Sequence, residues 1–195
     1  MTQEQRQVID RLKQAVSLLE ACSEFSALVP EVRTNFVYAL ADAKTASDIA
    51  GVDGRITVVE GMPKASGPVR FGVSDHLARR IIEFRKYDKT IRSALNFRWN
   101  ETILEFIQAD CKEKRLELGV VDRKEEPKEL IGKDKGSMSW KVKQLVESCG
   151  GKIPPVFYET RGWGKEPLFI LVGSDPLELA EQAIDIASGF TCRKL

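Results

Sequence analysis

Histidine and cysteine, the residues that most often bind zinc, are scarce in this sequence. It has one histidine and four cysteines, and no two cysteines form a CxxC pair. A typical zinc site needs several Cys or His ligands close together, so the sequence predicts no such site. We instead expect four reduced thiols that pack as small apolar side chains, namely Cys22, Cys111, Cys149 and Cys192.

Long apolar runs and an excess of charge of one sign are also lacking. No stretch of about 18 apolar residues occurs, so we expect no transmembrane helix. The first residues, MTQEQRQVIDRLKQ, are too polar for a signal peptide. The formal net charge is +1, which favours neither nucleic acid nor an anionic membrane as a partner. These features predict a cytoplasmic protein.

Helical and strand-like patterns alternate along the 195 residues, of which 43% are apolar. This alternation predicts a single α/β domain over residues 1–195, in which helices cover both faces of one sheet. The predicted strands are 32–41, 55–60, 68–73, 91–97, 116–121, 156–159 and 168–172. The predicted helices are about 3–22, 75–87, 101–114, 137–149 and a last helix that opens at Asp175-Pro176.

The segments between these elements carry weaker signals. We expect one short helical turn over 45–50 and loops at the glycine-proline pairs around 61–63 and 66–68. Residues 122–136 are charged and rich in turn formers, which is typical of a lid, a binding loop or a disordered loop. The first helix is amphipathic, so it could cover the interface of a homodimer.

Three segments combine glycine, a hydroxyl or amide group, and a cation: 51–55 with 74–80, 133–139 and 161–165. Glycine lets backbone N–H groups approach an anion, and arginine offers a planar fork to phosphate. None of the three is a Walker A loop or a dinucleotide fingerprint. An ordinary turn at 161–165 and a solvated loop at 133–139 are the alternatives. Trp163, between two glycines, could form one wall of a site for an aromatic ligand.

The single histidine, His76, follows Ser74 and Asp75, either of which would cap a helix. The imidazole is therefore expected near a helix N-terminus, where N–H groups attract anions. Two interpretations stay open from the residues alone: a structural histidine, or one that transfers a proton or binds an oxyanion. Arg79 and Arg80 could likewise belong to a surface ion pair or to a site.

A series of short segments resembles the ThiN-type thiamine-phosphate synthases. They occur in the family's order over residues 28–187 and read VPEVRTNFVYAL, VDGRI, GPVRFGVSDHLARRI, IRSALNFRWN, TRGWGKEP and LFILVGSDPLELA. The resemblance implies a three-layer α/β/α fold with a mixed, mostly antiparallel sheet, like that of the AraD-type class II aldolases. It also implies a transferase that joins hydroxymethylpyrimidine pyrophosphate to hydroxyethylthiazole phosphate and releases pyrophosphate.

The resemblance assigns the family's functionally important arginine and histidine to Arg55 and His76. The implied substrates call for neutralised leaving-group charge and for two rings held in line. We expect Arg55 to bind the pyrophosphate, together with Mg²⁺ that the pyrophosphate carries. We expect His76 to donate a hydrogen bond to a leaving oxygen. The expected substrate-binding residues are Asn35, Ser74, Asp75, Asn96, Arg161 and Lys165; the metal ligands stay open.

The sequence also departs from the family's pattern. Arg33 stands where we expect the family to have glycine. No kinase domain precedes the segment, so we expect either a free-standing protein or one part of a fusion with a pyrimidine phosphate kinase. A non-catalytic sensor of thiamine phosphate is the alternative function, but the sensors of this family tend to lack the first helix and the histidine. A metal-dependent aldolase is disfavoured because it would need several histidines.

Overall fold

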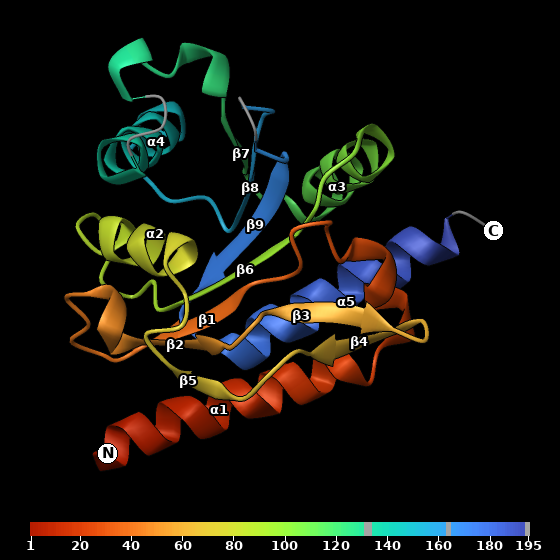
Figure 1. The fold of residues 1–195 in the computed structure, drawn as a ribbon. Helices are drawn as coiled ribbons and strands as arrows, with labels where there is room; N and C mark the ends of the chain where they lie inside the picture. The colour runs from red at the N-terminus through yellow and green to blue at the C-terminus, as the bar shows by residue number, and fades with distance from the viewer. Residues whose placement is uncertain (131–133, 163–164, 194–195) are drawn as a thin grey trace.

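A seven-stranded mixed sheet forms the middle layer of the computed structural model, which describes residues 1–130, 134–162 and 165–193 (Figure 1). The strand order is β5-β2-β1-β6-β9-β8-β7. Neighbouring strands run antiparallel except β7 and β8, which are parallel. The strands are β1 (Phe36–Ala39), β2 (Ile49–Val52), β5 (Val69–Phe71), β6 (Ser93–Arg98), β7 (Leu118–Val121), β8 (Val156–Glu159) and β9 (Leu168–Gly173).

Five α-helices within the described residues cover the two faces of this sheet. Two apolar clusters show the division, because one contains the buried side chains of α1, α3 and α5, and the other those of α2 and α4. Along β1, Phe36 and Tyr38 face the first cluster while Val37 and Ala39 face the second, as the pleat requires. The predicted three-layer α/β arrangement is confirmed. The helices are α1 (Gln3–Glu20), α2 (His76–Phe84), α3 (Glu101–Lys114), α4 (Asp134–Ser148) and α5 (Pro176–Cys192).

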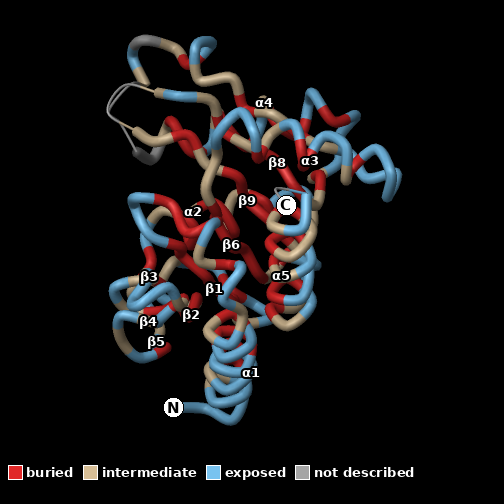
Figure 2. Tube along the Cα trace, turned by 90° about the vertical axis from the view of Figure 1, so that its right-hand side faces the viewer, coloured by how far each residue is buried: buried red, intermediate tan, exposed pale blue. Residues whose placement is uncertain are grey.

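The starts of α3 and α5 follow the capping signals of the sequence. The Asn100 side chain accepts a hydrogen bond from the backbone N–H of Ile103 at 2.8 Å and opens α3 at the predicted residue. Asp175 caps α5, with Pro176 in the first turn. In Figure 2 the buried residues follow the sheet while α1 shows its exposed side. The apolar stripe of α1 packs against α5 within the same chain, so it gives no support to a homodimer.

Several local predictions are wrong. The chain turns only briefly at Ala46–Asp48 and then enters β2, a strand that the sequence reading missed. The expected loop around 61–63 contains β4 (Met62–Ala65), which pairs with β3 (Ile56–Val59) in a separate two-stranded sheet. Pro63 is tolerated there because a two-stranded sheet consists only of edge strands. The expected loop also extends too far, because α4 already begins at Asp134.

The charged segment 122–136 is also more ordered than a plain loop. It forms two short 3₁₀ turns, Arg123–Glu125 and Lys128–Leu130, before α4; residues 131–133 of this segment lie outside the described residues. No α-helix within the described residues is both long and apolar enough to cross a membrane.

Candidate active site

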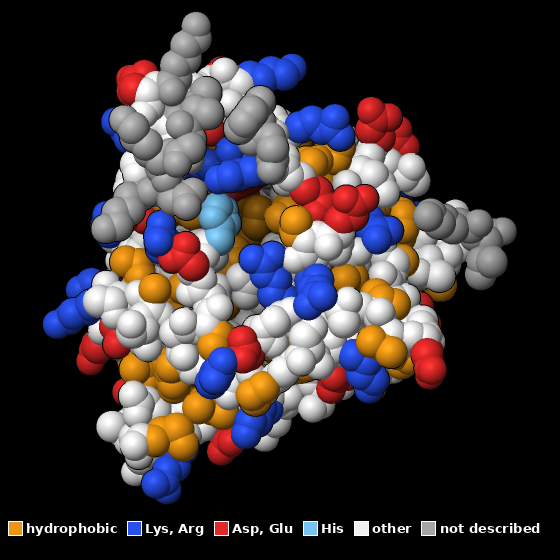
Figure 3. Space-filling view, in the orientation of Figure 1, with side chains coloured by type: hydrophobic (Ala, Val, Ile, Leu, Met, Phe, Trp, Pro, Cys, Tyr) orange, Lys and Arg blue, Asp and Glu red, His pale blue; other side chains and the backbone are white. Residues whose placement is uncertain are grey.

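Two adjoining cavities lie where the N-terminus of α2 meets the central strands. One has a volume of about 340 Å³ and the other about 460 Å³, and both are lined by Val32, Asn35, Arg55 and His76. The arginine and the histidine that the resemblance singled out thus face one shared space, although they lie in a loop and in a helix. In Figure 3 the histidine, drawn pale blue, borders a recess flanked by Lys and Arg side chains.

Backbone geometry places Arg55 at this recess. Gly54 and Arg55 both have positive φ angles, +70° and +68°, in a tight turn that leads into β3. The guanidinium Nη1 of Arg55 donates a hydrogen bond to the carbonyl oxygen of Val32 at 2.6 Å. Arg33 also has a φ of +68°, so the position expected to hold glycine does have a glycine-like backbone.

His76 is the first residue of α2, and its imidazole is partly buried. Its Nε2 lies 3.3 Å from Nη2 of Arg80, one helical turn further on. Burial and the charges of Arg80, Lys141 and Lys165 lower the pKa of His76 to about 3, and Glu159 offsets only part of this effect. The imidazole is therefore neutral at physiological pH.

Asp75 precedes the helix but does not cap it. Its side chain makes no hydrogen bond to the first turn and instead forms an ion pair with Arg79 at 2.7 Å on the surface. The prediction of a capping Asp75 is wrong, because the residue has helical backbone angles and its carboxylate turns to Arg79. Asp75 still lines the larger cavity together with Ser74.

Three buried polar residues form the floor of the cavities. Asn96 Oδ1 accepts from the backbone N–H of Asn35 at 2.7 Å, and Asn35 Nδ2 donates to Ser74 Oγ at 2.9 Å. Asn96 Nδ2 donates to the carbonyl oxygen of Arg33 at 3.3 Å. These bonds hold both amides in fixed orientations at the cavity. An amide that recognises the edge of an aromatic ring needs such a fixed orientation.

Arg161 and Lys165 both line a third cavity, but only Lys165 also lines a cavity with His76. Lys165 lines the 340 Å³ cavity with His76, whereas Arg161 is exposed and lines a neighbouring cavity of about 880 Å³. Lys165 and Glu166 also line this third cavity, so the spaces adjoin. Arg161 is thus placed beside the Arg55 and His76 site rather than within it. Trp163 and Gly164 lie outside the described residues.

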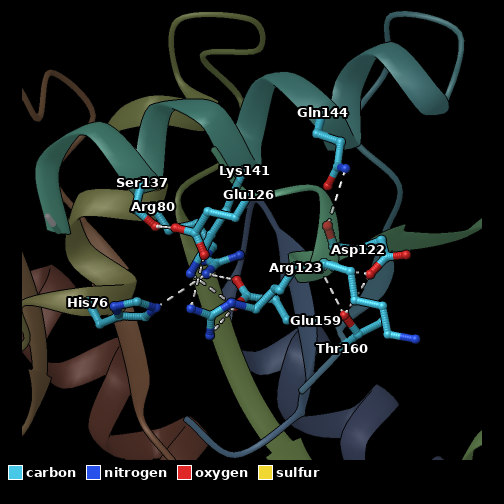
Figure 4. Close-up of polar contacts among 11 residues, drawn as sticks. His76, Arg80, Asp122, Arg123, Glu126, Ser137, Lys141, Gln144, Glu159 and Thr160 are labelled. Carbon is cyan, nitrogen blue, oxygen red and sulfur yellow. Dashed lines mark hydrogen bonds and ion pairs between the residues drawn. The ribbon is translucent and has the colours of Figure 1, made fainter. Parts of the chain in front are cut away.

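A buried ionic cluster behind His76 was missed by sequence reasoning. Its centre is Glu159, whose carboxylate pairs with Arg80, with Lys141 at 3.2 Å and with Arg123 at 3.9 Å (Figure 4). Arg123 also reaches Glu126 at 3.3 Å, and Glu126 accepts a hydrogen bond from the Ser137 hydroxyl. The signal in the sequence was Lys141 itself, a charge on the apolar stripe of α4.

Electrostatics within this cluster shift two pKa values. Burial lowers the pKa of Lys141 to about 8, with Glu159 opposing the shift and Arg80 adding to it. Burial alone would raise the pKa of Glu159, but Arg80 and Lys141 hold it well below its usual range. The cluster therefore keeps Glu159 ionised in the protein interior.

The carboxylates around the cavities limit how a metal ion could be held. No group of three His, Cys, Asp or Glu side chains suited to a metal occurs among the described residues. The 340 Å³ cavity is lined by Glu159, which is engaged by cations, and by Glu166, which accepts from the backbone N–H groups of Glu31 and Val32. Asp75 at the larger cavity is the more accessible carboxylate. This donor set suits Mg²⁺ only if most ligands come from a phosphorylated substrate.

Comparison with known proteins gives consistent similarities. The family model described as "Thiamine-phosphate synthase ThiN" matches residues 11–185. A "Thiamine-phosphate synthase ThiN" from Methanothermobacter thermautotrophicus is 34% identical over 178 residues, which are 91% of each chain. A "Bifunctional thiamine biosynthesis protein ThiDN" from Methanocaldococcus jannaschii is 30% identical over 90% of this chain, which spans only 39% of that relative.

Solved structures resemble the fold as well. The C-terminal domain of a phosphomethylpyrimidine kinase matches with a TM-score of 0.87 at 34% identity. The match covers 94% of this chain and 100% of that domain. An l-fuculose-1-phosphate aldolase from Thermus thermophilus matches with a TM-score of 0.51 at 11% identity. This match covers 91% of this chain and 89% of the aldolase chain. The second similarity concerns the fold alone and agrees with the AraD-like architecture expected from the sequence.

Proposed function

Because this chain belongs to the ThiN family of thiamine-phosphate synthases, a family of transferases, we propose that the joined cavities around Arg55 and His76 are its active site. The substrates assigned to this site are hydroxymethylpyrimidine pyrophosphate and hydroxyethylthiazole phosphate. In the matched bifunctional relative and in the kinase C-terminal domain the same fold accompanies a second activity, so we also propose that the chain acts with a pyrimidine phosphate kinase.

The single observation that carries this assignment is that Arg55 and His76 line one cavity. Lys165 brings further positive charge to the same space, and a guanidinium such as that of Arg55 binds phosphate oxygens through paired N–H donors. Leu77, Leu168 and Ile170 supply an apolar wall on which an aromatic ring can rest. A cationic end beside an apolar wall suits a phosphorylated heterocycle.

The reaction requires one bond to break and one to form. The C–O bond between the pyrimidine methylene and pyrophosphate breaks, and pyrophosphate leaves with the electron pair. The thiazole nitrogen then donates its lone pair to the methylene carbon, which forms the C–N bond of thiamine phosphate. Arg55 stabilises the charge that develops on the leaving oxygens. The neutral imidazole of His76 donates a hydrogen bond to the same group.

The remaining residues orient the substrates. Asn35 and Asn96, whose amides are fixed at the cavity floor, bind the edge of the aminopyrimidine, with Ser74 holding Asn35 in place. Lys165 binds phosphate between the cavities, and Arg161 attracts anionic substrate from the adjoining space. Mg²⁺ bound through the pyrophosphate would neutralise further negative charge, and Asp75 is the residue proposed to contact it.

Turnover tests the assignment directly. Purified protein mixed with both substrates and Mg²⁺ should form thiamine phosphate and pyrophosphate, measured by chromatography and a pyrophosphate assay. His76→Ala and Arg55→Ala should each lower kcat/KM by about 100-fold or more, whereas the surface variant Lys86→Ala should not. Tight binding of thiamine phosphate without turnover would instead support the sensor function.

A second measurement assigns Arg55 to one substrate. Arg55→Ala should raise the KM for the pyrimidine pyrophosphate more than the KM for the thiazole phosphate, because the pyrophosphate carries the charge that Arg55 is proposed to bind. Equal increases in both KM values would reject this role and leave Arg55 as a general contributor to the positive potential.

A further inference from the structure

We propose that Arg80 and Glu159 are positioning residues that hold His76 as the tautomer with its proton on Nδ1. This inference rests on the proposed role of His76 and adds a reason why the buried cluster lies directly behind it. The ring nitrogen on the cluster side is then only an acceptor, and Nδ1–H is the donor left for the substrate.

The contact between Arg80 and His76 determines the tautomer. The two residues are four positions apart in α2, so their side chains lie on one face of the helix. Nη2 of Arg80 is 3.3 Å from Nε2 of His76. A guanidinium can donate hydrogen bonds but cannot accept them, so Nε2 must be the acceptor and must carry no proton. A neutral imidazole with a bare Nε2 has its proton on Nδ1.

The same contact disfavours the imidazolium form. Protonation of Nε2 would place an N–H donor against the N–H of Arg80, and a second positive charge beside the guanidinium. Lys141 and Lys165 add to this repulsion, and Glu159 is the nearby carboxylate that opposes it.

Glu159 keeps the Arg80 guanidinium in place. Arg80 is 1% exposed, pairs with the Glu159 carboxylate and lies over the ring of Phe157 at 5.4 Å from its centre. Glu159 is held in turn by Lys141 from α4 and by Arg123 from the 3₁₀ turn after β7 (Figure 4). Four elements thus converge to orient one guanidinium toward one imidazole.

Stability alone does not explain this arrangement. Nε and Nη1 of Arg80 are buried and have no hydrogen-bond partner among the described residues. Unsatisfied buried donors oppose folding, and a well-packed apolar side chain at this place would avoid that loss. Arg80 is linked to the proposed reaction through its hydrogen bond to His76.

The first experiment needs no variant. Because the protein has a single histidine, its imidazole ¹⁵N signals in a long-range ¹H–¹⁵N NMR spectrum are unambiguous. At pH 7 the wild-type protein should show a neutral ring with Nδ1 protonated and Nε2 bare. A ring protonated on Nε2, or an imidazolium, would overturn the proposal.

The second experiment separates positioning from structural support. Arg80→Met should release Nε2, move the ring toward the Nε2-protonated tautomer, and lower kcat by about 10- to 100-fold. KM for both substrates should change by less than about threefold, because neither phosphate loses a ligand. Arg80→Lys should restore part of kcat, since an ammonium can still donate to the ring. Lys86→Met, which removes a surface cation paired with Glu83 just after the same helix, is the matched control and should alter neither the tautomer nor kcat.

Contrary outcomes are distinct from a failure of the proposed function. If folded Arg80→Met keeps the wild-type tautomer and kcat and only its melting temperature falls, Arg80 is structural and this inference is wrong. If Arg80→Met does not fold, Glu159→Gln replaces it. This variant should show a smaller shift of the tautomer and a smaller loss of kcat. An unchanged NMR spectrum would count against the proposal. If His76→Ala retains full activity, the proposed function itself fails, whatever the tautomer.

Discussion

Two arginines with left-handed backbone conformations, Arg33 and Arg55, line the 460 Å³ cavity. Arg33 and Arg55 both have φ of +68°, a region in which the Cβ atom of an L-residue is crowded at a cost of about 1–2 kcal/mol. Arg33 Nη1 donates to the carbonyl of Gly54 at 3.1 Å, while Arg55 donates to the carbonyl of Val32. Each side chain therefore binds the backbone next to the other arginine, and strain is retained at a site of proposed function.

A pair of substitutions at Arg55 separates its side chain from its backbone. Arg55→Gly and Arg55→Ala should lose activity alike, because both lack the guanidinium. The glycine variant should nevertheless be more stable than the alanine variant by about 1 kcal/mol, since glycine adopts a φ of +68° without crowding. Urea denaturation of the two variants measures this difference. Equal stabilities would mean that the turn relaxes once the side chain is gone.

The neutral histidine predicts a specific dependence of stability on pH. The folded-state pKa of His76 is about 3 and the unfolded value is 6.5. Between these values the unfolded chain binds a proton that the folded protein does not, so stability falls as the pH falls below 6.5. The wild type should lose up to about 1.4 kcal/mol per pH unit more than His76→Gln over this window.

Denaturant titrations of both proteins at about pH 7, 6 and 5 measure the effect. Groups other than His76 titrate in both proteins and largely cancel in the difference. Parallel stability profiles for the wild type and His76→Gln would show that the imidazole ionises normally in the folded protein, and would contradict its burial beside Arg80.

At the scale of elements, one carboxylate joins the first and the last helix. Asp175 Oδ1 accepts from the backbone N–H groups of Leu177 and Glu178 at the start of α5, while Oδ2 pairs with Arg11 of α1 at 2.7 Å. Burial alone would raise the pKa of Asp175, but the bonds from Arg11 and from the Leu177 N–H lower it. Asp175 therefore both caps α5 and links it to α1, in addition to the apolar packing between the two helices.

Substitution of this cap should cost more than loss of its ion pair. Asp175→Ala should lower the free energy of unfolding by about 1–2 kcal/mol, because two backbone donors lose their acceptor. Arg11→Ala should lower it by less than about 1 kcal/mol, since the Arg11 side chain is 47% exposed. Asp185→Ala, on the exposed side of α5, is the control. Equal losses for the first two variants would contradict the capping role; chemical denaturation gives all three values.

At the scale of the whole molecule, the cavities gather residues that are far apart in the sequence. Asn35 precedes β1, Arg55 precedes β3, His76 begins α2 with Arg80 one turn further on, and Asn96 lies in β6. The end of β8, which carries the central carboxylate of the ionic cluster, lies far along the chain from the first of these residues. A ligand in this space contacts both the early and the late part of the fold, so its binding energy should stabilise the molecule as a whole.

Thiamine phosphate should therefore raise the melting temperature in a concentration-dependent manner. At about 100 times its Kd the added stability should be about 2.7 kcal/mol. Hydrogen exchange should slow together at residues 32–35, 74–80 and 156–159. Arg55→Gly should show a weaker thermal shift, whereas Lys86→Ala should match the wild type. Protection confined to one of these segments would contradict a shared binding cavity.

The sequence alone determined the helices, most strands and the candidate residues. Local signals are sufficient for these: Asn100 and Asp175 are caps, apolar residues recur at helical spacing, and the blocks around Arg55 and His76 resemble one family. Even the glycine expected at residue 33 was informative, because the backbone there has the positive φ that glycine favours. Such features depend on a few neighbouring residues and can be read without knowing the fold.

Only the tertiary structure decided which distant residues meet. The placement of Arg161 outside the cavity of His76, the pairing of β4 with β3, and the convergence of Arg80, Lys141 and Glu159 all depend on contacts between segments far apart in the chain. A lysine on the apolar stripe of a helix indicates a buried charge, but the sequence does not show which residue pairs with it. The partner is set by sheet order and helix packing, which arise from the long-range burial of apolar surface rather than from local pattern.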